Sequence, residues 1–226
     1  MQTFHETVII GGGIHGTYLA NKLSHEVTTD IAIIDPNPRL LAQWKRNTRN
    51  CGQTHLRSPD QHNLGRDGES LLRFAVRQGR MNEIQALSGV ERPTLNLFND
   101  HGDYVIRNEG LESMLKQASV TRVNRDFSIK TDNGELIFAD RIILALGQVG
   151  GPYWPSWATK LRNTRRGYHI FEKEFNIDTV ADLDQPVYVV GGGITAVQLA
   201  TKLAQLRGNT NYPVTLISKD QLKIAE

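Results

Sequence analysis

Residues Thr7-Val-Ile-Ile-Gly-Gly-Gly-Ile-His-Gly16 decide the fold of this chain of 226 residues. The first four are mostly apolar and β-branched, which predicts a short buried strand. A glycine-rich turn follows, and residues 17–23 then carry leucine and alanine at helical spacing. A second apolar run, residues 31–34, ends in Asp35-Pro36. Continuous apolar strands joined by a helix are typical of a buried parallel sheet, so we expect an α/β fold.

The glycines of this turn, Gly11, Gly13 and Gly16, have the spacing G-x-G-x-x-G. The first permits the sharp bend, the second lets a pyrophosphate approach the backbone, and the third allows helix and strand to pack closely. The start of the helix then offers unpaired N–H groups to an anion. Asp35 lies 19 residues after Gly16, close to the offset of about 20 at which an acid bonds a ribose. The pattern predicts a dinucleotide site; the alternative is a tight turn without a ligand.

The same pattern recurs near the end of the sequence. Its elements are an apolar run at 187–190, the glycine cluster Gly191, Gly193 and Ala196, a helix over 197–206 and an apolar run at 214–217. Alanine is allowed in the third position of the fingerprint. Ser218 and Lys219 stand where the acid is expected. A hydroxyl and an ammonium group suit a 2′-phosphate, which favours NADP over NAD; the alternative is that Lys219 is an ordinary solvated lysine.

The segment between the two copies is more mixed. Short helices are predicted over 71–76 and 109–118, a polar loop over 49–66, apolar segments at 120–123 and 127–129, a hairpin at Asp132-Asn133-Gly134 and a buried strand over 142–147. We therefore predict an N-terminal domain over 1–150, a connector rich in Pro, Trp and Arg over 151–186, and the start of a second nucleotide-binding unit over 187–226.

Composition narrows the class of protein. Apolar residues make up 39% and charged residues 22% of the chain, and the formal net charge is +2, which suits an anionic ligand but is too small to argue for nucleic acid. Cys51 is the only cysteine, which excludes an intrachain disulfide or a CxxC redox pair. No apolar stretch approaches the length of a membrane span. We expect a cytoplasmic protein with a small-molecule substrate, no metal, no nucleic-acid or membrane partner, and the possibility of a homo-oligomer.

Two such units separated by a small β-insertion resemble the flavoproteins with two dinucleotide-binding domains. The resemblance implies an FAD-binding Rossmann-like three-layer domain with a β-meander, at 120–138, followed by the start of a second Rossmann-like unit that binds NAD(P)H. The strand end Leu144-Ala145-Leu146-Gly147 is similar to a second FAD-contacting segment. The resemblance implies that the cofactors are FAD and NADPH, held by Gly11, Gly13, Ile14, His15, Gly16, Asp35, Trp44, Gly147, Gly191, Gly193, Ala196 and Lys219.

Within this superfamily, the connector is similar to that of flavin-containing and lysine/ornithine N-hydroxylating monooxygenases. A strand end at Ala145-Leu146-Gly147 precedes Pro152 and Pro155, and His169 comes before the second fingerprint. The Phe-x-Gly that usually precedes this histidine is missing. His169 is either a hinge or NADP contact, or a surface histidine. The loop Leu56-Arg57-Ser58-Pro59 resembles the segment that lies along the flavin in the N-hydroxylases.

This resemblance implies an FAD-dependent, NADPH-using oxidoreductase of the monooxygenase kind. NADPH would reduce the flavin, oxygen would be activated as a flavin peroxide, and a nucleophile such as an amine would be hydroxylated. One alternative is a flavin reductase that passes electrons to a quinone or a protein without oxygenation. Another is a nucleotide-binding module without catalysis. The residues do not identify a catalytic acid or base, or the substrate.

The second unit has only one helix and two strands before Glu226. In the families it resembles, this unit continues and the chain then returns to complete the FAD domain. We therefore expect either a fragment or a shortened relative, in which FAD binding is retained and turnover of NADPH is in doubt.

Overall fold

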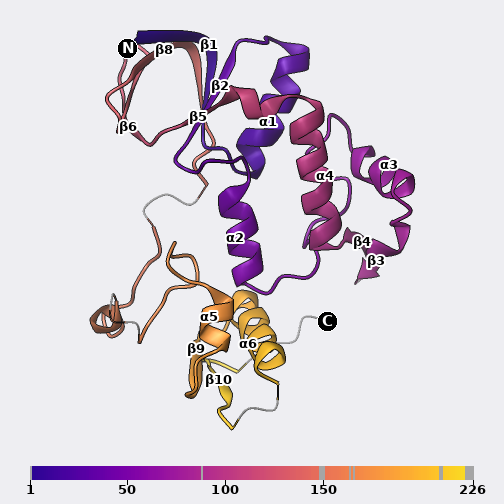
Figure 1. Cartoon of the computed structure of the whole chain (residues 1–226), viewed down its shortest axis with the longest axis vertical. Coiled ribbons are helices and arrows are strands. Elements are labelled where there is room, and N and C mark those ends of the chain that lie inside the picture. Colours follow the sequence, from indigo (N-terminus) through magenta and orange to yellow (C-terminus); the bar gives the residue numbers. More distant parts are fainter. Residues whose placement is uncertain are drawn as a thin grey trace. The chain divides into compact units, whose positions relative to one another are not determined.

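The computed structural model describes residues 2–87, 89–147, 151–162, 164, 166–208 and 211–221. The chain divides into two compact units (Figure 1). The first comprises residues 1–45 and 54–149, and the second comprises residues 46–53 and 150–226. Each unit contains one of the two glycine-rich turns.

The first unit is built on a six-stranded sheet in the order β5-β2-β1-β8-β7-β6. Its strands are β1 (Gln2–Ile10), β2 (Ile31–Asp35), β5 (Leu115–Gln117), β6 (Val120–Val123), β7 (Ser128–Thr131) and β8 (Leu136–Leu144). β1 pairs in parallel with β2 and β8, and β2 pairs in parallel with β5. β6, β7 and the beginning of β8 are antiparallel neighbours, as the predicted meander requires. The turn at Gly134 adopts φ +82°, and the predicted hairpin is confirmed.

Buried side chains of the helical segments form one hydrophobic core with one face of this sheet. The segments are α1 (Ile14–Glu26), α3 (Ser70–Arg77) and α4 (Leu95–Asn108), with the short turns η1 (Met81–Glu83) and η2 (Leu111–Met114) and the hairpin β3 (Ile84–Leu87) and β4 (Val90–Pro93). α2 (Ala42–Asn50) begins in the first unit, and its residues from 46 onward belong to the second. Because strand side chains alternate between faces, Ile9 and Ile33 enter the core with the helices, whereas Val8, Ile10 and Ile34 pack with Ile129 and Ile137 on the other face.

The predicted helix over 109–118 is wrong. α4 already ends at Asn108, and Gly110 takes φ +65°, which a helix cannot continue through. The next residues form η2 and then β5, whose backbone pairs with β2 at Leu115, Lys116 and Gln117. Tertiary pairing with an existing strand thus overrides the local helical pattern. The predicted helix over 71–76 is confirmed as α3.

The second unit has a smaller core of its own. β9 (Val187–Val190) and β10 (Val214–Ile217) pair in parallel, with Val190 beside Ile217, and α6 (Ile194–Arg207) connects them. Val189, Leu199 and Leu203 pack with residues of α5 (Ile177–Ala181). The short turn η3 (Thr159–Leu161) lies in the connector. The predicted strand, helix and strand of the second copy are therefore present.

Candidate nucleotide-binding loops

The first glycine-rich turn is shaped by contacts that exclude side chains at two positions. Gly11 has φ +112°, and a Cβ placed there would lie 2.4 Å from the carbonyl oxygen of Ala145. A Cβ on Gly16 would lie 1.8 Å from the carbonyl oxygen of Gly11. Gly13 differs, since a Cβ there would meet no heavy atom within 4 Å. The middle glycine of the fingerprint therefore faces open space, where a ligand can approach the backbone.

Asp35 reaches this turn from the end of β2. Its Oδ2 accepts a hydrogen bond from the N–H of Gly12 at 2.7 Å, and its Oδ1 accepts from the backbone and side-chain amides of Asn37, each at 2.8 Å. Asp35 is 9% exposed. Asp35 therefore lies next to the predicted pyrophosphate loop, and its first role in this structure is to hold that loop to the sheet.

Two further residues hold Gly12 at its carbonyl group, in the next peptide along the chain. The carbonyl oxygen of Gly12 accepts from the N–H of Leu41 at 2.8 Å and from Oγ1 of Thr17 at 3.2 Å. Leu41 is fully buried and adopts φ +62°, a left-handed conformation that is unfavourable for a leucine. We call Asp35, Thr17 and Leu41 the Gly12 clamp. Sequence reasoning missed both Thr17 and Leu41. For Leu41 the sequence offers no signal, because nothing in Leu40-Leu41 indicates a positive φ.

The other predicted residues of the first site lie at the turn or in the core beside it. Ile14 and His15 begin α1, whose first turn has no acidic residue, and Thr17 N–H makes an early helical bond to Gly13 O at 2.9 Å. Gly147 lies just beyond β8 with φ +65°. Trp44 is half-buried; its indole N–H donates to Oδ1 of Asn99 at 3.1 Å, and its ring meets Phe98 edge-on. Trp44 thus helps to anchor α4.

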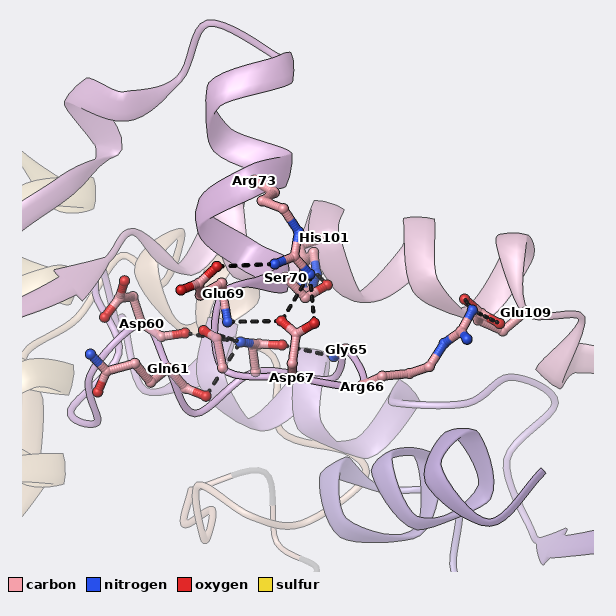
Figure 2. A network of polar contacts seen from close by, with 12 residues as sticks. Asp60, Gln61, Gly65, Arg66, Asp67, Glu69, Ser70, Arg73, His101 and Glu109 are labelled. Carbon is pink, nitrogen blue, oxygen red and sulfur yellow. Dashed lines mark hydrogen bonds and ion pairs between the residues drawn. The ribbon is translucent and has the colours of Figure 1, made fainter. Parts of the chain in front are cut away.

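The polar loop that follows α2 is tied down at many points (Figure 2). The side-chain amide of Asn63 donates to the carbonyl oxygen of Gly68 at 3.0 Å, and its oxygen accepts from the N–H of Gly65 at 2.8 Å. Asn21 of α1 donates to the carbonyl oxygen of Leu64 at 2.9 Å. Leu56 is buried and its N–H bonds to the carbonyl oxygen of Pro93 at 3.0 Å. The loop therefore has a defined conformation and is bonded to α1 and β4 of the first unit.

Charged residues on the solvent-exposed side of this loop form ion pairs. Arg73 pairs with Asp67 at 2.7 Å and lowers the pKa of that carboxyl group, and Arg66 pairs with Glu109 at 3.1 Å (Figure 2). Deeper in, Oγ of Ser70 lies 3.0 Å from Nε2 of His101. His101 is fully buried, and burial lowers its pKa to about 4. The imidazole is therefore neutral at physiological pH and supports the loop as a hydrogen-bonding core residue.

The second glycine-rich turn has the same backbone path with different side chains. The N–H of Gly191 bonds to the carbonyl oxygen of Ile217 at 2.9 Å, just as that of Gly11 bonds to Ile34 at 2.8 Å. A Cβ on Gly192 would lie 2.6 Å from Oγ of Ser218, which itself donates to the carbonyl oxygen of Asp220 at 2.7 Å.

The remaining predicted residues of the second site surround this turn. A Cβ on Gly191 would lie 3.1 Å from the methyl group of Ala196. Gly193 precedes α6 and, like Gly13, has open space where a Cβ would be. Lys219 follows β10 and is exposed. The end of β10 therefore places the Ser218 hydroxyl beside the turn, and exposed Lys219 and then Asp220 follow it along the chain.

His169 lies in the connector beside an internal carboxylate. Its Nδ1 accepts from the N–H of Phe171 at 3.3 Å, and its own backbone N–H donates to Oε2 of Glu172 at 3.1 Å. Burial lowers the pKa of His169. The same Glu172 accepts from the indole N–H of Trp154 at 2.9 Å. His169 is thus a half-buried neutral residue that helps to shape the connector.

No cluster of three potential metal-ligating side chains occurs among the residues that the structure describes. In the same part of the chain, no helix combines the length and the apolar character that crossing a membrane requires.

Solved structures share this fold. Cyclohexanone monooxygenase from Rhodococcus sp. Phi1, solved with NADP+, is 20% identical with a TM-score of 0.59; the match covers 96% of this chain and 38% of that one. For the flavin-containing monooxygenase of Stenotrophomonas maltophilia the identity is 16%, the TM-score 0.57 and the coverage 98% and 59%. The bacillithiol disulfide reductase of Staphylococcus aureus is 17% identical with a TM-score of 0.55, and the match covers 96% of this chain and 57% of that one. The chain thus spans between 38% and 59% of the length of these proteins.

A search of curated proteins finds no match. The family model described as pyridine nucleotide-disulphide oxidoreductase matches residues 5–222, which is nearly the whole sequence and includes both glycine-rich turns. The chain therefore belongs to the pyridine nucleotide-disulphide oxidoreductase family.

Proposed function

We propose that the first unit binds FAD, that the second binds NADPH, and that the chain is the nucleotide-binding part of an FAD-dependent oxidoreductase. The observation that carries the proposal is the first turn. Gly12 is held at its N–H by Asp35 and at its carbonyl oxygen by Leu41, while the space where a Cβ of Gly13 would lie is open. A loop that is fixed before the ligand arrives, with its free side toward a helix N-terminus, suits a pyrophosphate.

The residues present fit this group. The first turn of α1 has no carboxylate to repel a phosphate, and the N–H groups that begin a helix have no partner within it. Ile14, His15 and Gly16 supply these groups, and the Asp35 carboxylate lies at the strand end where a ribose would be bound. When bound, the flavin would accept a hydride from reduced nicotinamide. Hydride transfer does not require an acid or base from the protein, whose task in this step is to position the nucleotides.

The preference for NADPH rests on the second turn. Ser218 occupies the place that Asp35 has in the first unit, and exposed Lys219 follows it. A carboxylate at this position would repel a 2′-phosphate, whereas a hydroxyl and a cation attract it. Family membership and the NADP+-bound monooxygenase of similar fold support the same assignment.

The reaction class that we favour is monooxygenation of a nucleophile such as an amine, because two of the three similar structures named above are monooxygenases. A reductase without oxygenation is the second candidate, and the similar disulfide reductase supports it. Transfer through a cysteine pair does not suit these 226 residues, which hold only the buried Cys51. Residues beyond the matched part of these larger proteins would select the substrate.

The first test is the visible absorption spectrum of the purified chain after incubation with FAD. A bound flavin spectrum supports the first site, and bleaching by NADPH in oxygen-free buffer supports the second. Lys219→Ala should raise the NADPH concentration needed for half-reduction about tenfold, because a phosphate–ammonium contact is lost. Lys173→Ala, also at an exposed lysine of the second unit, should leave it unchanged. A chain that remains colourless with excess FAD contradicts the proposal.

A further inference from the structure

The connector contains a stretch of one-sided charge. Residues 151–171 hold no aspartate or glutamate, although the whole chain has 24 acids against 26 lysines and arginines. Four cations occur within seven positions of this stretch, at Lys160, Arg162, Arg165 and Arg166. A weak net charge for the chain therefore conceals a local concentration of positive charge, which is a signal for an anionic partner.

Aromatic side chains in the same stretch are exposed to solvent. Tyr153 is 80% and Trp157 is 60% exposed, and Leu161 is 38% exposed. In the described part of the chain, neither Tyr153 nor Trp157 packs against another aromatic ring. A tryptophan left this open is unusual for a residue that buries so much area when it is packed.

The exposed groups are presented by a segment that is itself anchored. Trp154, next to Tyr153, is held by its indole N–H bond of 2.9 Å to Glu172, and Ala158, next to Trp157, is 5% exposed. Glu172 also lies 3.5 Å from Arg162, so this acid is used within the connector. Lys160 and Arg166 are exposed, and no described acid forms an ion pair with either. Their charge is therefore available to a partner.

We propose that this segment, whose exposed residues Tyr153, Trp157, Lys160, Leu161 and Arg166 we call the connector patch, docks the protein on an anionic lipid bilayer. Tryptophan and tyrosine favour the headgroup region because one part of each ring is apolar and the other is polar. Lysine and arginine near the surface are attracted to anionic headgroups. A leucine beside them adds apolar area that enters the acyl boundary.

A bilayer fits these observations better than other polyanions do. Single-stranded nucleic acid binds where aromatic rings form a platform for successive bases, and the two exposed rings here are not stacked with any other ring. The expectation of no membrane partner was based on the absence of a spanning stretch, which does not bear on docking at the surface.

The test is sedimentation of the intact chain, without nucleotide, with vesicles of phosphatidylcholine alone or with phosphatidylserine added. We expect binding only to the anionic vesicles, with less binding at high salt. Each cation near the surface changes the partition about fivefold, so the double variant Lys160→Gln/Arg166→Gln should bind roughly 25-fold more weakly. The control Lys130→Gln/Arg125→Gln, with the same charge change at exposed residues of the first unit, should bind like the parent chain.

Tryptophan fluorescence provides a second readout. Lipids brominated on their acyl chains should quench the emission of the bound chain, and Trp157→Phe should remove most of that quenching while Trp44→Phe retains it. Failure of the parent chain to bind anionic vesicles overturns the proposal, as does quenching that survives in Trp157→Phe. Binding to heparin or an oligonucleotide that is tighter than binding to vesicles assigns the patch to a soluble polyanion instead. None of these outcomes depends on FAD or NADPH binding.

Discussion

The two glycine-rich turns follow one backbone path and are secured differently. In the first, the Asp35 carboxylate bonds the Gly12 N–H at 2.7 Å and Leu41 bonds the Gly12 carbonyl at 2.8 Å. In the second, Ser218 stands in the position of Asp35, and its hydroxyl bonds to the backbone of Asp220 instead. In the first unit Asp35 holds the loop, and under the proposed function it also places negative charge where a ribose would bind. Ser218 does not bring that charge to the second turn, and the proposal assigns a 2′-phosphate to this position.

The glycines themselves should give the largest effect. Gly11→Ala places a methyl group against the Ala145 carbonyl at a positive φ, so we expect the free energy of unfolding to fall by roughly 3 kcal/mol or more. Gly13→Ala has open space and should keep its stability while losing FAD affinity, because the methyl group occupies the ligand's approach. Chemical denaturation and FAD titration of both variants measure this. Equal destabilisation by the two would contradict the assigned roles.

Acid should give the next largest effect. Burial lowers the pKa of His101 to about 4, whereas an unfolded histidine has a pKa near 6.5. The unfolded chain therefore binds a proton that the folded chain does not, and stability falls as the pH drops from about 6.5 to about 4, by roughly 3 kcal/mol. Urea melts of the chain across this range should show the loss.

A matched variant keeps this test specific. His101→Gln retains a hydrogen-bonding group near Ser70 and cannot titrate, so the pH dependence between about 6.5 and 4 should flatten even if the variant is less stable at neutral pH. An unchanged slope would assign the acid sensitivity to other groups.

Exchanging the residue types at positions 35 and 218 should sharpen the comparison. Asp35→Ser removes a charged partner of the Gly12 N–H, and we expect FAD binding to weaken about 10- to 100-fold. Ser218→Asp should reduce the preference for NADPH over NADH by a similar factor, because a carboxylate repels the 2′-phosphate. Asp140→Ser, at an exposed position on β8, is the control. If FAD affinity and the preference for NADPH over NADH are both unchanged in these variants, Asp35 and Ser218 do not select the nucleotides.

The smallest effect concerns Leu41. Leu41→Ala and Leu41→Gly remove the same packing apart from one methyl group, but only glycine adopts φ +62° without strain. The glycine variant should therefore be the more stable of the two by about 1 kcal/mol. At an ordinary helical site alanine would be the more stable, so the sign of the difference, measured by denaturation, is the test.

The fold class and the family could be predicted from the sequence, because strand, glycine turn, helix and strand are all local patterns. The structure and the family match confirm both. α4 was missed although a signal exists: Thr94 caps the helix by accepting from the N–H of Leu97 at 3.1 Å. The helix predicted over 109–118 was wrong because β5 is stabilised by β2, a partner that no local window contains.

The site was harder to predict than the fold. Gly11, Gly13 and Gly16 and the position of Asp35 follow from spacing. Leu41 could not be found, because its conformation is imposed by surrounding packing and not by its own preference. The hydrogen bonds of Asn63 have a weak signal in the sequence Asn63-Leu64-Gly65, because an asparagine side-chain oxygen often accepts from the N–H two residues ahead. The roles of Ile14, His15, Trp44, Gly147 and Lys219 toward nucleotides remain proposals.

The pairing of β1 with β8 also sets an order of events during synthesis. Ile10 pairs with Leu144, and the Ala145 carbonyl forms the back wall of Gly11. The fingerprint emerges from the ribosome first, yet its turn cannot be completed until a strand encoded far downstream has joined the sheet. Such long-range closure slows folding. A nascent chain that stops before β8 would therefore carry the whole fingerprint and still lack the strand and the carbonyl group that lie behind Gly11.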